Sequence, residues 1–486
     1  MPERGIKDSR ELTCTSTGRK CEYDDAGPRQ SKACGYNRTV PVPSSITDRL
    51  SESPEDNQLL HIFRLTTENE LSRQFEPFCW AHLMLQLARI YPSVRQSICA
   101  VGALQRAYLR GEQRSHNCQD ILEVVSTPLV LARYSMAVKS VSEDLCPSLQ
   151  PVLICCALFT WLEFLSNNFE TGLKHLRSGL EIIRNWSRKP ESAGPKANLP
   201  TDPVDKSILQ LFMRLQTHVT AHGYPHTDFH STSSIKLSRN VATVKDRYLT
   251  MSGAWSLLDH IMLKVFRFVR HKEYIERSIS HFDSSSPEFA ELLRSRDSLL
   301  ADLGQWQALF IRSSSTWSNN SQGANCGTLL LKSYHLMTNI ILNTVLAESE
   351  VAYDDHVHDF SKLVSMAQQI IRSTTGPTFI TLDVGVTPVL FFTCLKCRNT
   401  SIRNQALALL RLAPEREGIW HRDSIIAVST LKITLEGNMK TRLYGERVLD
   451  AESRSQTARV KVFNETMKEI VIVEIPGLVS KLGDLL

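Results

Sequence analysis

The stretch from Pro151 to Leu165 constrains the fold more than any other part of this sequence. Its residues are apolar on nearly every side of a helix, and the run from 151 to 162 is interrupted only by Thr160. A helix that is apolar all round must be buried, either in a large core or in a bilayer. The run is shorter than the roughly 20 residues that span a bilayer. The stretch therefore predicts the central helix of a large packed body.

A second helix is expected directly after the first. Residues 169–183 carry apolar side chains at helical spacing, so these side chains share one face. The polar residues 166–168 lie between the two segments, and we expect an αα-hairpin across them. The side chains expected to be buried in this hairpin are Leu153, Phe159, Leu162, Leu173, Leu176 and Leu180.

Helical periodicity dominates the chain from about residue 58, which predicts an all-α fold of many helices. Apolar stripes fall within residues 80–91, before Pro92, and within 94–108, before Gly111. Another stripe contains Tyr134, Val138, Val141 and Leu145. Further helices are expected near residues 204–217, 254–272, 287–310, 326–347, 358–372 and 400–412. At the C-terminus, residues 459–463 alternate and residues 470–475 are β-branched and apolar, which predicts a short β-hairpin.

The first 57 residues differ in composition from the rest. They are poor in aliphatic side chains and rich in Ser, Pro, Asp and Arg, so we expect a disordered N-terminal segment that includes a linker at 41–57. Residues 313–322 are polar and are also expected to form a disordered loop. No apolar signal is visible in the first ten residues, so a soluble, intracellular protein with reduced cysteines is expected.

Neither the net charge nor the sequence motifs indicate a particular function, and none of the motifs supports a catalytic role. The net charge of +5 is weak over 486 residues and does not by itself indicate nucleic-acid binding. The sequence contains no phosphate-binding glycine loop, no H-E-x-x-H and no nucleophile elbow. We therefore do not expect an enzyme.

Three clusters of reactive residues have simpler structural interpretations. His218, His222, His226 and His230 recur every four residues, but Gly223 and Pro225 would break a helix, so a polar His-rich loop is expected. The pair Cys394 and Cys397 lacks a second pair for zinc and follows an apolar run, so both should be core cysteines in a helix. The acidic residues Asp354 and Asp355 are expected in a solvated loop.

The N-terminal segment contains one more cysteine pair, Cys14 and Cys21, which frame Thr-Ser-Thr-Gly-Arg-Lys. A structural zinc site needs four ligands, so two cysteines alone do not close one. By itself the segment indicates a flexible basic tail with two free thiols.

The segment from Cys14 to Tyr23 resembles the closing loop of the fungal six-cysteine zinc binuclear cluster. Cys14 and Cys21 match the fifth and sixth cysteines of that cluster, whereas Glu11 stands where the fourth should be. The resemblance implies zinc as the family's cofactor. The basic helix with which that family reads bases has no counterpart here, so Arg19 and Lys20 are expected to contact at most DNA phosphates.

Residues from about 58 to the end resemble the regulatory region of the same transcription-factor family. The matching segments are 71–80, 152–165, 175–180, Lys396–Arg398, Ile402–Arg403, Ala406–Leu407 and Arg416–Trp420. The resemblance implies an all-α body, a nuclear location and control of transcription, often of secondary-metabolite genes, without catalytic residues.

The sequence thus predicts three segments. Residues 1–40 would be a remnant of the zinc-cluster region, 41–57 a linker, and 58–486 a helical regulatory domain that binds protein partners of the transcription machinery or a small-molecule signal. A homodimer is also possible under this interpretation. DNA would be bound only if the zinc cluster were complete. The incomplete cluster would reflect either an error in the gene model or a true truncation. The alternative is a helical metabolic enzyme or ligand-binding protein that shares only the scaffold.

Overall fold

The computed structural model of the chain divides into two units, residues 1–46 and 47–486. All described residues belong to the second unit. They are residues 51, 53–68, 83–111, 128–143, 149–166, 168–187, 203–222, 249–278, 286–315, 317, 322–347, 349–373, 380–381, 384–439, 443–451, 457–464 and 469–476. Over these ranges the fold is all-α with small sheets, as the sequence predicted. No helix in them is long and apolar enough to cross a membrane.

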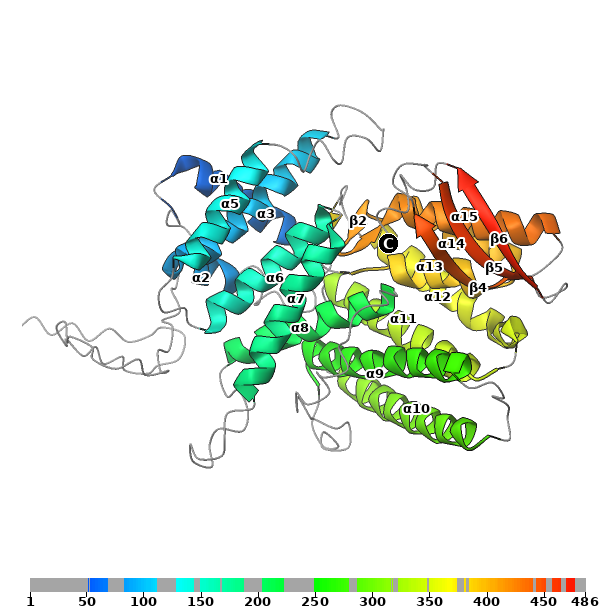
Figure 1. The fold of residues 1–486 in the computed structure, drawn as a ribbon. Coiled ribbons are helices and arrows are strands. Elements are labelled where there is room, and N and C mark those ends of the chain that lie inside the picture. Colours follow the sequence, from blue (N-terminus) through cyan, green and yellow to red (C-terminus); the bar gives the residue numbers. More distant parts are fainter. Residues whose placement is uncertain are drawn as a thin grey trace, which may run out of the picture. The chain divides into compact units, whose positions relative to one another are not determined.

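Seven of the described helices, labelled in Figure 1, contribute side chains to one hydrophobic core. They are α1 (Pro54–Glu68), α2 (Met84–Ile90), α3 (Pro92–Gly111), α5 (Pro128–Ser142), α6 (Leu149–Leu165), α7 (Phe169–Ser187) and α8 (Pro203–His222). Among the described residues, α1 is the first helix, and it begins at Pro54.

The central helix and its hairpin are confirmed. Helix α6 is buried along almost its whole length, because both its faces carry apolar side chains that other helices cover. All six side chains expected to be buried in the hairpin are at most 6% exposed. The helices α6 and α7 approach closely because Gly172 has no side chain, and a Cβ there would lie 2.6 Å from the Phe164 ring.

The stripe expected on α5 is wrong at Val138. Its residues Tyr134 and Val141 are half-buried, and Leu145 lies outside the described residues. Val138 is exposed, and the buried face of this helix instead contains Val130, Arg133 and Ala137. Arg133 is buried because its guanidinium lies 2.6 Å from carboxylate oxygens of both Glu55 and Asp56. A buried ion pair therefore overrode the apolar pattern, which treats arginine as a surface residue.

The remaining helices enclose a second core. They are α9 (Met251–Ser278), α10 (Pro287–Ser314), α11 (Gln322–Thr344), the 3-10 helix η5 (Glu350–His356), α12 (Val357–Ser373), α13 (Thr387–Lys396), α14 (Thr400–Leu410) and α15 (Arg422–Met439). All the helices expected from residue 204 onward are present, whereas α15 was not anticipated.

The disordered loop expected at 313–322 is wrong at its two ends, since α10 includes Ser313 and Ser314 and α11 begins at Gln322, whereas residues 316 and 318–321 lie outside the described residues. Ser313 is a buried helical residue that accepts a hydrogen bond from the backbone N–H of Leu249. Trp317 donates its indole N–H to the carbonyl oxygen of Leu249 over 2.8 Å. These contacts tie the end of α10 to the start of α9.

Two small sheets complete the fold. The first joins β1 (Ile380–Thr381), β2 (Arg416–Glu417) and β3 (Trp420–His421), with β1 and β2 parallel. The second is antiparallel and contains β4 (Leu443–Ala451), β5 (Thr457–Asn464) and β6 (Glu469–Pro476). The expected C-terminal hairpin is confirmed as β5 and β6, and β4 adds a third strand to it.

The two groups of helices meet where α8 packs against α9. Thr217 on α8 donates its hydroxyl proton to the carbonyl oxygen of Asp259 on α9. Arg270 on α9 donates to the carbonyl oxygen of Thr220 over 2.8 Å. These hydrogen bonds join the C-terminal end of α8 to the middle of α9 and so shape the space between the two cores.

Candidate functional site

A tight turn from Arg416 to Trp420 connects the two cores. Gly418 at its centre adopts a positive φ of 57°, a conformation that costs glycine little and other residues more. The turn reverses the chain, so that β2 and β3 pair as antiparallel strands with Arg416 opposite His421. The four strand residues of this turn are all buried.

Arg416 connects the turn to the first core. Its side chain is fully buried, and one guanidinium nitrogen donates to the carbonyl oxygen of Phe164 on α6 over 3.2 Å. Carbonyl oxygens in the last turn of a helix lack intrahelical donors, so a cation there satisfies both a hydrogen-bond acceptor and the helix dipole. Arg416 therefore supports the end of the central helix.

Glu417 connects the same turn to the second core. Its carboxylate accepts hydrogen bonds of 2.9 Å from the backbone N–H groups of Gly385 and Thr387, at the start of α13. Burial raises the pKa of Glu417 from 4.5 to about 7, against the opposing effect of the hydrogen bonds from Thr387 and Gly385. The turn thus holds α13 by its N-terminus.

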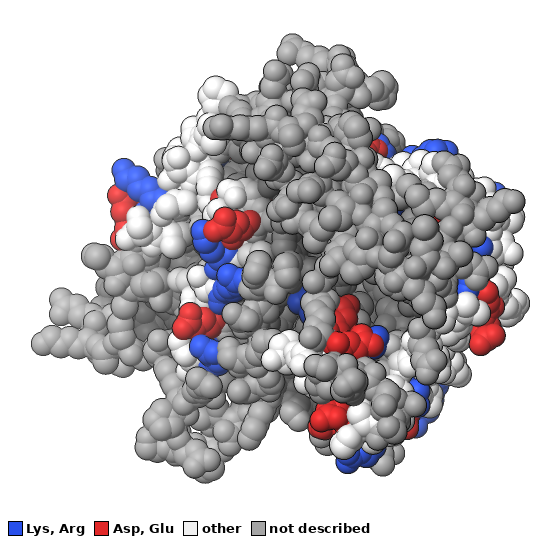
Figure 2. Space-filling model, turned by 45° about the vertical axis from the view of Figure 1, so that its right-hand side comes forward, with Lys and Arg blue, Asp and Glu red and all other residues white. Residues whose placement is uncertain are grey.

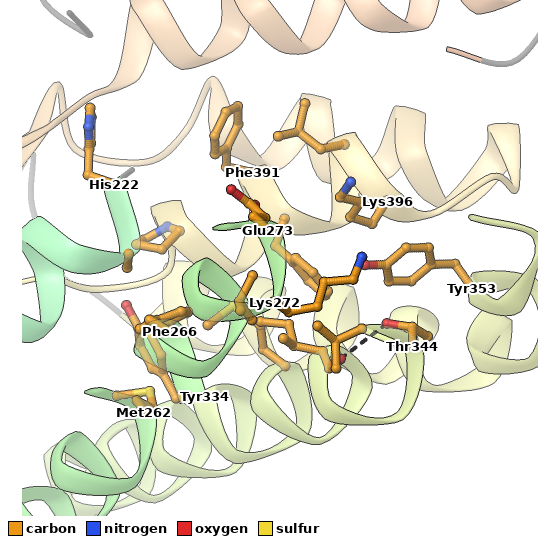
Figure 3. Close-up of a pocket in the computed structure, with 18 of the residues that line it drawn as sticks. His222, Met262, Phe266, Lys272, Glu273, Tyr334, Thr344, Tyr353, Phe391 and Lys396 are labelled. Atoms are coloured by element: carbon orange, nitrogen blue, oxygen red, sulfur yellow. Dashed lines mark hydrogen bonds between the residues drawn. The ribbon is translucent and has the colours of Figure 1, made fainter. Parts of the chain in front are cut away.

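Next to this turn lies a cavity of about 530 Å³. Its walls come from α8, α9, α11, α13, the segment around η5 and Trp420 on β3. A volume of this size fits a drug-sized molecule. Figure 3 shows His222, Met262, Phe266 and Tyr334 toward one end and Lys396 and Tyr353 toward the other, with Lys272 and Glu273 between them.

The histidine end of the cavity is apolar in character. The His222 ring lies 4.8 Å from the Trp420 ring and stacks on Phe169 at 6.4 Å. Burial lowers the pKa of His222 to about 4 and also lowers the pKa of His218, so both rings are neutral near pH 7. The indole N–H of Trp420 is buried and has no hydrogen-bond acceptor among the described residues.

The middle and the opposite end of the cavity carry charges in pairs. Lys396 on α13 forms an ion pair with Glu350, and its ammonium lies 5.6 Å from the centre of the Tyr353 ring. Lys272 on α9 forms an ion pair of 2.7 Å with Glu276. Each ammonium is therefore matched by a carboxylate at hydrogen-bond distance.

This arrangement is suited to binding a small molecule. Apolar and aromatic walls remove ligand surface from water, and a few polar groups at one end can orient the ligand. Within the described ranges, no group of three or more His, Cys, Asp or Glu side chains is placed to hold a metal ion.

The structure corrects one sequence interpretation at this site. His218 and His222 lie on the last turns of α8, not in a polar loop, and both line the cavity. His218 is buried, whereas His222 is half-buried with both ring nitrogens shielded from solvent. The physical reason is that the last turns of α8 pack against α9 and place the His222 ring 4.8 Å from the Trp420 ring, so the helix continues to His222. His226 and His230 lie outside the described residues.

The other candidate residues have mixed outcomes. Cys394 and Cys397 are buried in the second core as expected, although Cys397 lies just after α13, and burial raises the pKa of Cys394 to about 12. Asp354 and Asp355 are exposed on η5. The zinc-cluster candidates Cys14, Arg19, Lys20 and Cys21 lie outside the described residues.

Figure 2 shows the charged side chains of the described residues on one face of the molecule. There the described Lys and Arg side chains are interspersed with Asp and Glu and do not gather into one basic patch. A nucleic-acid interface would require such a patch. On that face, the described residues therefore give no reason to place DNA against the helical body.

Comparison with known proteins gives one informative match. The aspercryptin biosynthesis cluster-specific transcription regulator atnN of Emericella nidulans is 20% identical over 526 aligned positions, which cover 84% of this chain and 81% of the relative. The chain is similar to a fungal transcription regulator. No family model matches the chain, and no solved structure does.

The cavity had no clear signal in the sequence. Its residues come from segments up to about two hundred positions apart, such as Thr217 and Trp420, and each segment reads as an ordinary core helix. The nearest signal was Arg416–Trp420, which was identified only through a family resemblance.

Proposed function

We propose that this chain is a transcription regulator of the fungal zinc-cluster type. It acts in the nucleus on genes transcribed by RNA polymerase II, through a helical regulatory domain. The similarity to a cluster-specific transcription regulator over most of both chains carries the proposal. The all-α body supports it, because the family resemblance at Arg416–Trp420 and along α6 implies such a body.

Direct DNA contact needs a complete zinc cluster. The residues Cys14 and Cys21 supply the last two of six cysteines in that cluster, and Arg19 and Lys20 lie between them. Control of a secondary-metabolite gene cluster is the class of target that the relative's name indicates.

The function is tested by tethering. The full chain is fused to a heterologous DNA-binding domain, and a reporter with matching sites is measured in a fungal host. The proposal requires a reporter change of several-fold in either direction and accumulation of a fluorescent fusion in the nucleus. A fusion that enters the nucleus and leaves the reporter at its baseline contradicts the proposal.

The second candidate function is that of a helical enzyme or ligand-binding protein that shares only the scaffold. The cavity is the observation that favours it, because the cavity is lined by buried groups with shifted pKa values such as His222. Small-molecule binding combined with a silent reporter would favour this candidate over the regulator.

A further inference from the structure

We infer that the cavity is the binding site of an uncharged, mainly apolar small molecule that acts as the effector of this regulator. That the ligand controls transcription rests on the proposed function, whereas binding itself does not depend on it. The argument rests on the cavity's walls, its charge balance and its place between the two cores.

The walls supply apolar contact on several sides. Phe266 on α9 and Phe391, Phe392 and Trp420 from the opposite side offer aromatic faces and edges. Met262 and Met337 add flexible side chains that adapt to an irregular ligand. Such walls exclude water, so the ligand body gains binding energy mainly by burying apolar area.

The charge balance of the lining disfavours an anion. Two lysines and three glutamates line the cavity, and both lysines are already paired, Lys272 with Glu276 and Lys396 with Glu350. An anionic ligand would have to displace one of these carboxylates and leave it near the cavity without its partner, which is costly in a partly buried site.

A cation is disfavoured for a different reason. The carboxylates of Glu276 and Glu350 are already paired with Lys272 and Lys396, and the charge of Glu273 acts on Arg270. A cation would therefore lose its water on entering without gaining an unmatched carboxylate. A neutral hydroxyl or amide can use the paired lysines and glutamates as donors and acceptors without breaking either ion pair. The cavity is therefore matched to a neutral polar end on an apolar body.

The position of the cavity gives the ligand a way to act. The α8 residues Thr217, His218 and His222 come from the helix that closes the first core, whereas α9, α11 and α13 belong to the second. A ligand between them contacts both groups and stabilises the arrangement in which its contacts are made. Trp420 gives the ligand a second connection between the two cores. It belongs to the same turn as Arg416, which binds α6, and Glu417, which binds the start of α13.

The test uses the purified full chain with two dyes of opposite character. Nile red is uncharged, and 1-anilinonaphthalene-8-sulfonate is an anion of similar apolar content. Nile red fluorescence should titrate to one site per chain, and the anionic dye should bind at least about tenfold more weakly. Equal or tighter binding of the anion would overturn the proposed ligand class.

Cavity-filling variants locate the bound dye. Ala221→Phe on α8 and Val269→Phe on α9 place a ring into the cavity from two walls, and each should weaken Nile red binding by at least about tenfold. Ala301→Phe is the matched control, because Ala301 lies exposed on α10 and does not line the cavity. Folded variants, judged by circular dichroism, that retain wild-type affinity would overturn the site.

A measurement on the unmodified chain decides the case if both variants unfold. Hydrogen exchange with and without Nile red should show added protection in α8, α9, α11 and α13. Protection that is absent, or that falls only on other helices, would overturn the site. If the chain binds the dye as expected but leaves the tethered reporter unchanged, the binding site is supported and the regulator function is contradicted. The failure of one proposal is therefore distinguishable from the failure of the other.

Discussion

The buried carboxyl of Glu417 should make the stability of this protein depend on pH in an unusual direction. Burial raises the pKa of Glu417 from 4.5 to about 7. Between these two values the unfolded chain releases the proton while the folded chain keeps it, so the free energy of unfolding falls as the pH rises. At about 1.4 kcal/mol for each pKa unit, the interval corresponds to roughly 3 kcal/mol, present below pH 4.5 and lost above about pH 7.

The buried histidines act in the opposite direction. Burial lowers the pKa values of His222, His260 and His335 from 6.5 to about 4. Their contribution to stability is present above pH 6.5 and is lost as the pH falls toward 4. A pH profile of the unmodified protein mixes both effects, so it does not isolate Glu417.

The perturbation that isolates Glu417 is Glu417→Gln. The glutamine oxygen can still accept from the N–H groups of Gly385 and Thr387, while the side chain no longer titrates. Urea unfolding of both proteins is followed by circular dichroism at several values between pH 4 and pH 7.5. The unmodified protein's free energy of unfolding, relative to that of the variant, should fall by roughly 3 kcal/mol over this range.

The control is Glu291→Gln, because Glu291 lies exposed on α10. Its difference curve should be flat. The reasoning about Glu417 is refuted if the Glu417→Gln difference curve is equally flat, or if it rises with pH.

Three further predictions concern packing, ion pairs and DNA. Gly172→Ala should lower the free energy of unfolding by about 1–3 kcal/mol, because the added Cβ would meet the Phe164 ring. Gly304→Ala has open space around it and should raise the free energy of unfolding by about 0.5–1 kcal/mol. Thermal melts measure both variants. Arg133→Leu should cost about 3–5 kcal/mol in urea unfolding, since it leaves Asp56 buried without its cation, and Lys139→Leu, in an exposed pair, should cost less than about 1 kcal/mol. The chain as given should bind duplex DNA weakly and with steep salt dependence, and a salt-resistant preference of about tenfold (about 1.4 kcal/mol) for CGG-type half-sites in a titration of labelled fragments would contradict this.

Periodicity predicted the helices well because burial of an apolar face is a local property of the sequence. The hairpin of α6 and α7 followed from apolar spacing and a polar turn, and its six named side chains are buried. The C-terminal strands β5 and β6 followed from alternation in the same way.

Two of the misses share one cause, which is a partner far away in the sequence. Val138 was expected in the core, but Arg133 occupies the buried face because Glu55 and Asp56 on α1 neutralise it. His218 and His222 were expected in a loop, but they lie on the last turns of α8, which pack against α9 of the second core. Neither outcome has a local signal, because each depends on which element packs against that face.

The sequence by itself therefore determined the all-α class, most helix positions and the resemblance to a family of regulators, since these depend on the local order of residues. The tertiary structure decided the candidate site. Only the packing of α8 against α9, together with the turn that joins Arg416 to α6 and Glu417 to α13, encloses the cavity. A cavity is a property of the space between elements, so its shape and charge balance appear only once distant segments are brought together.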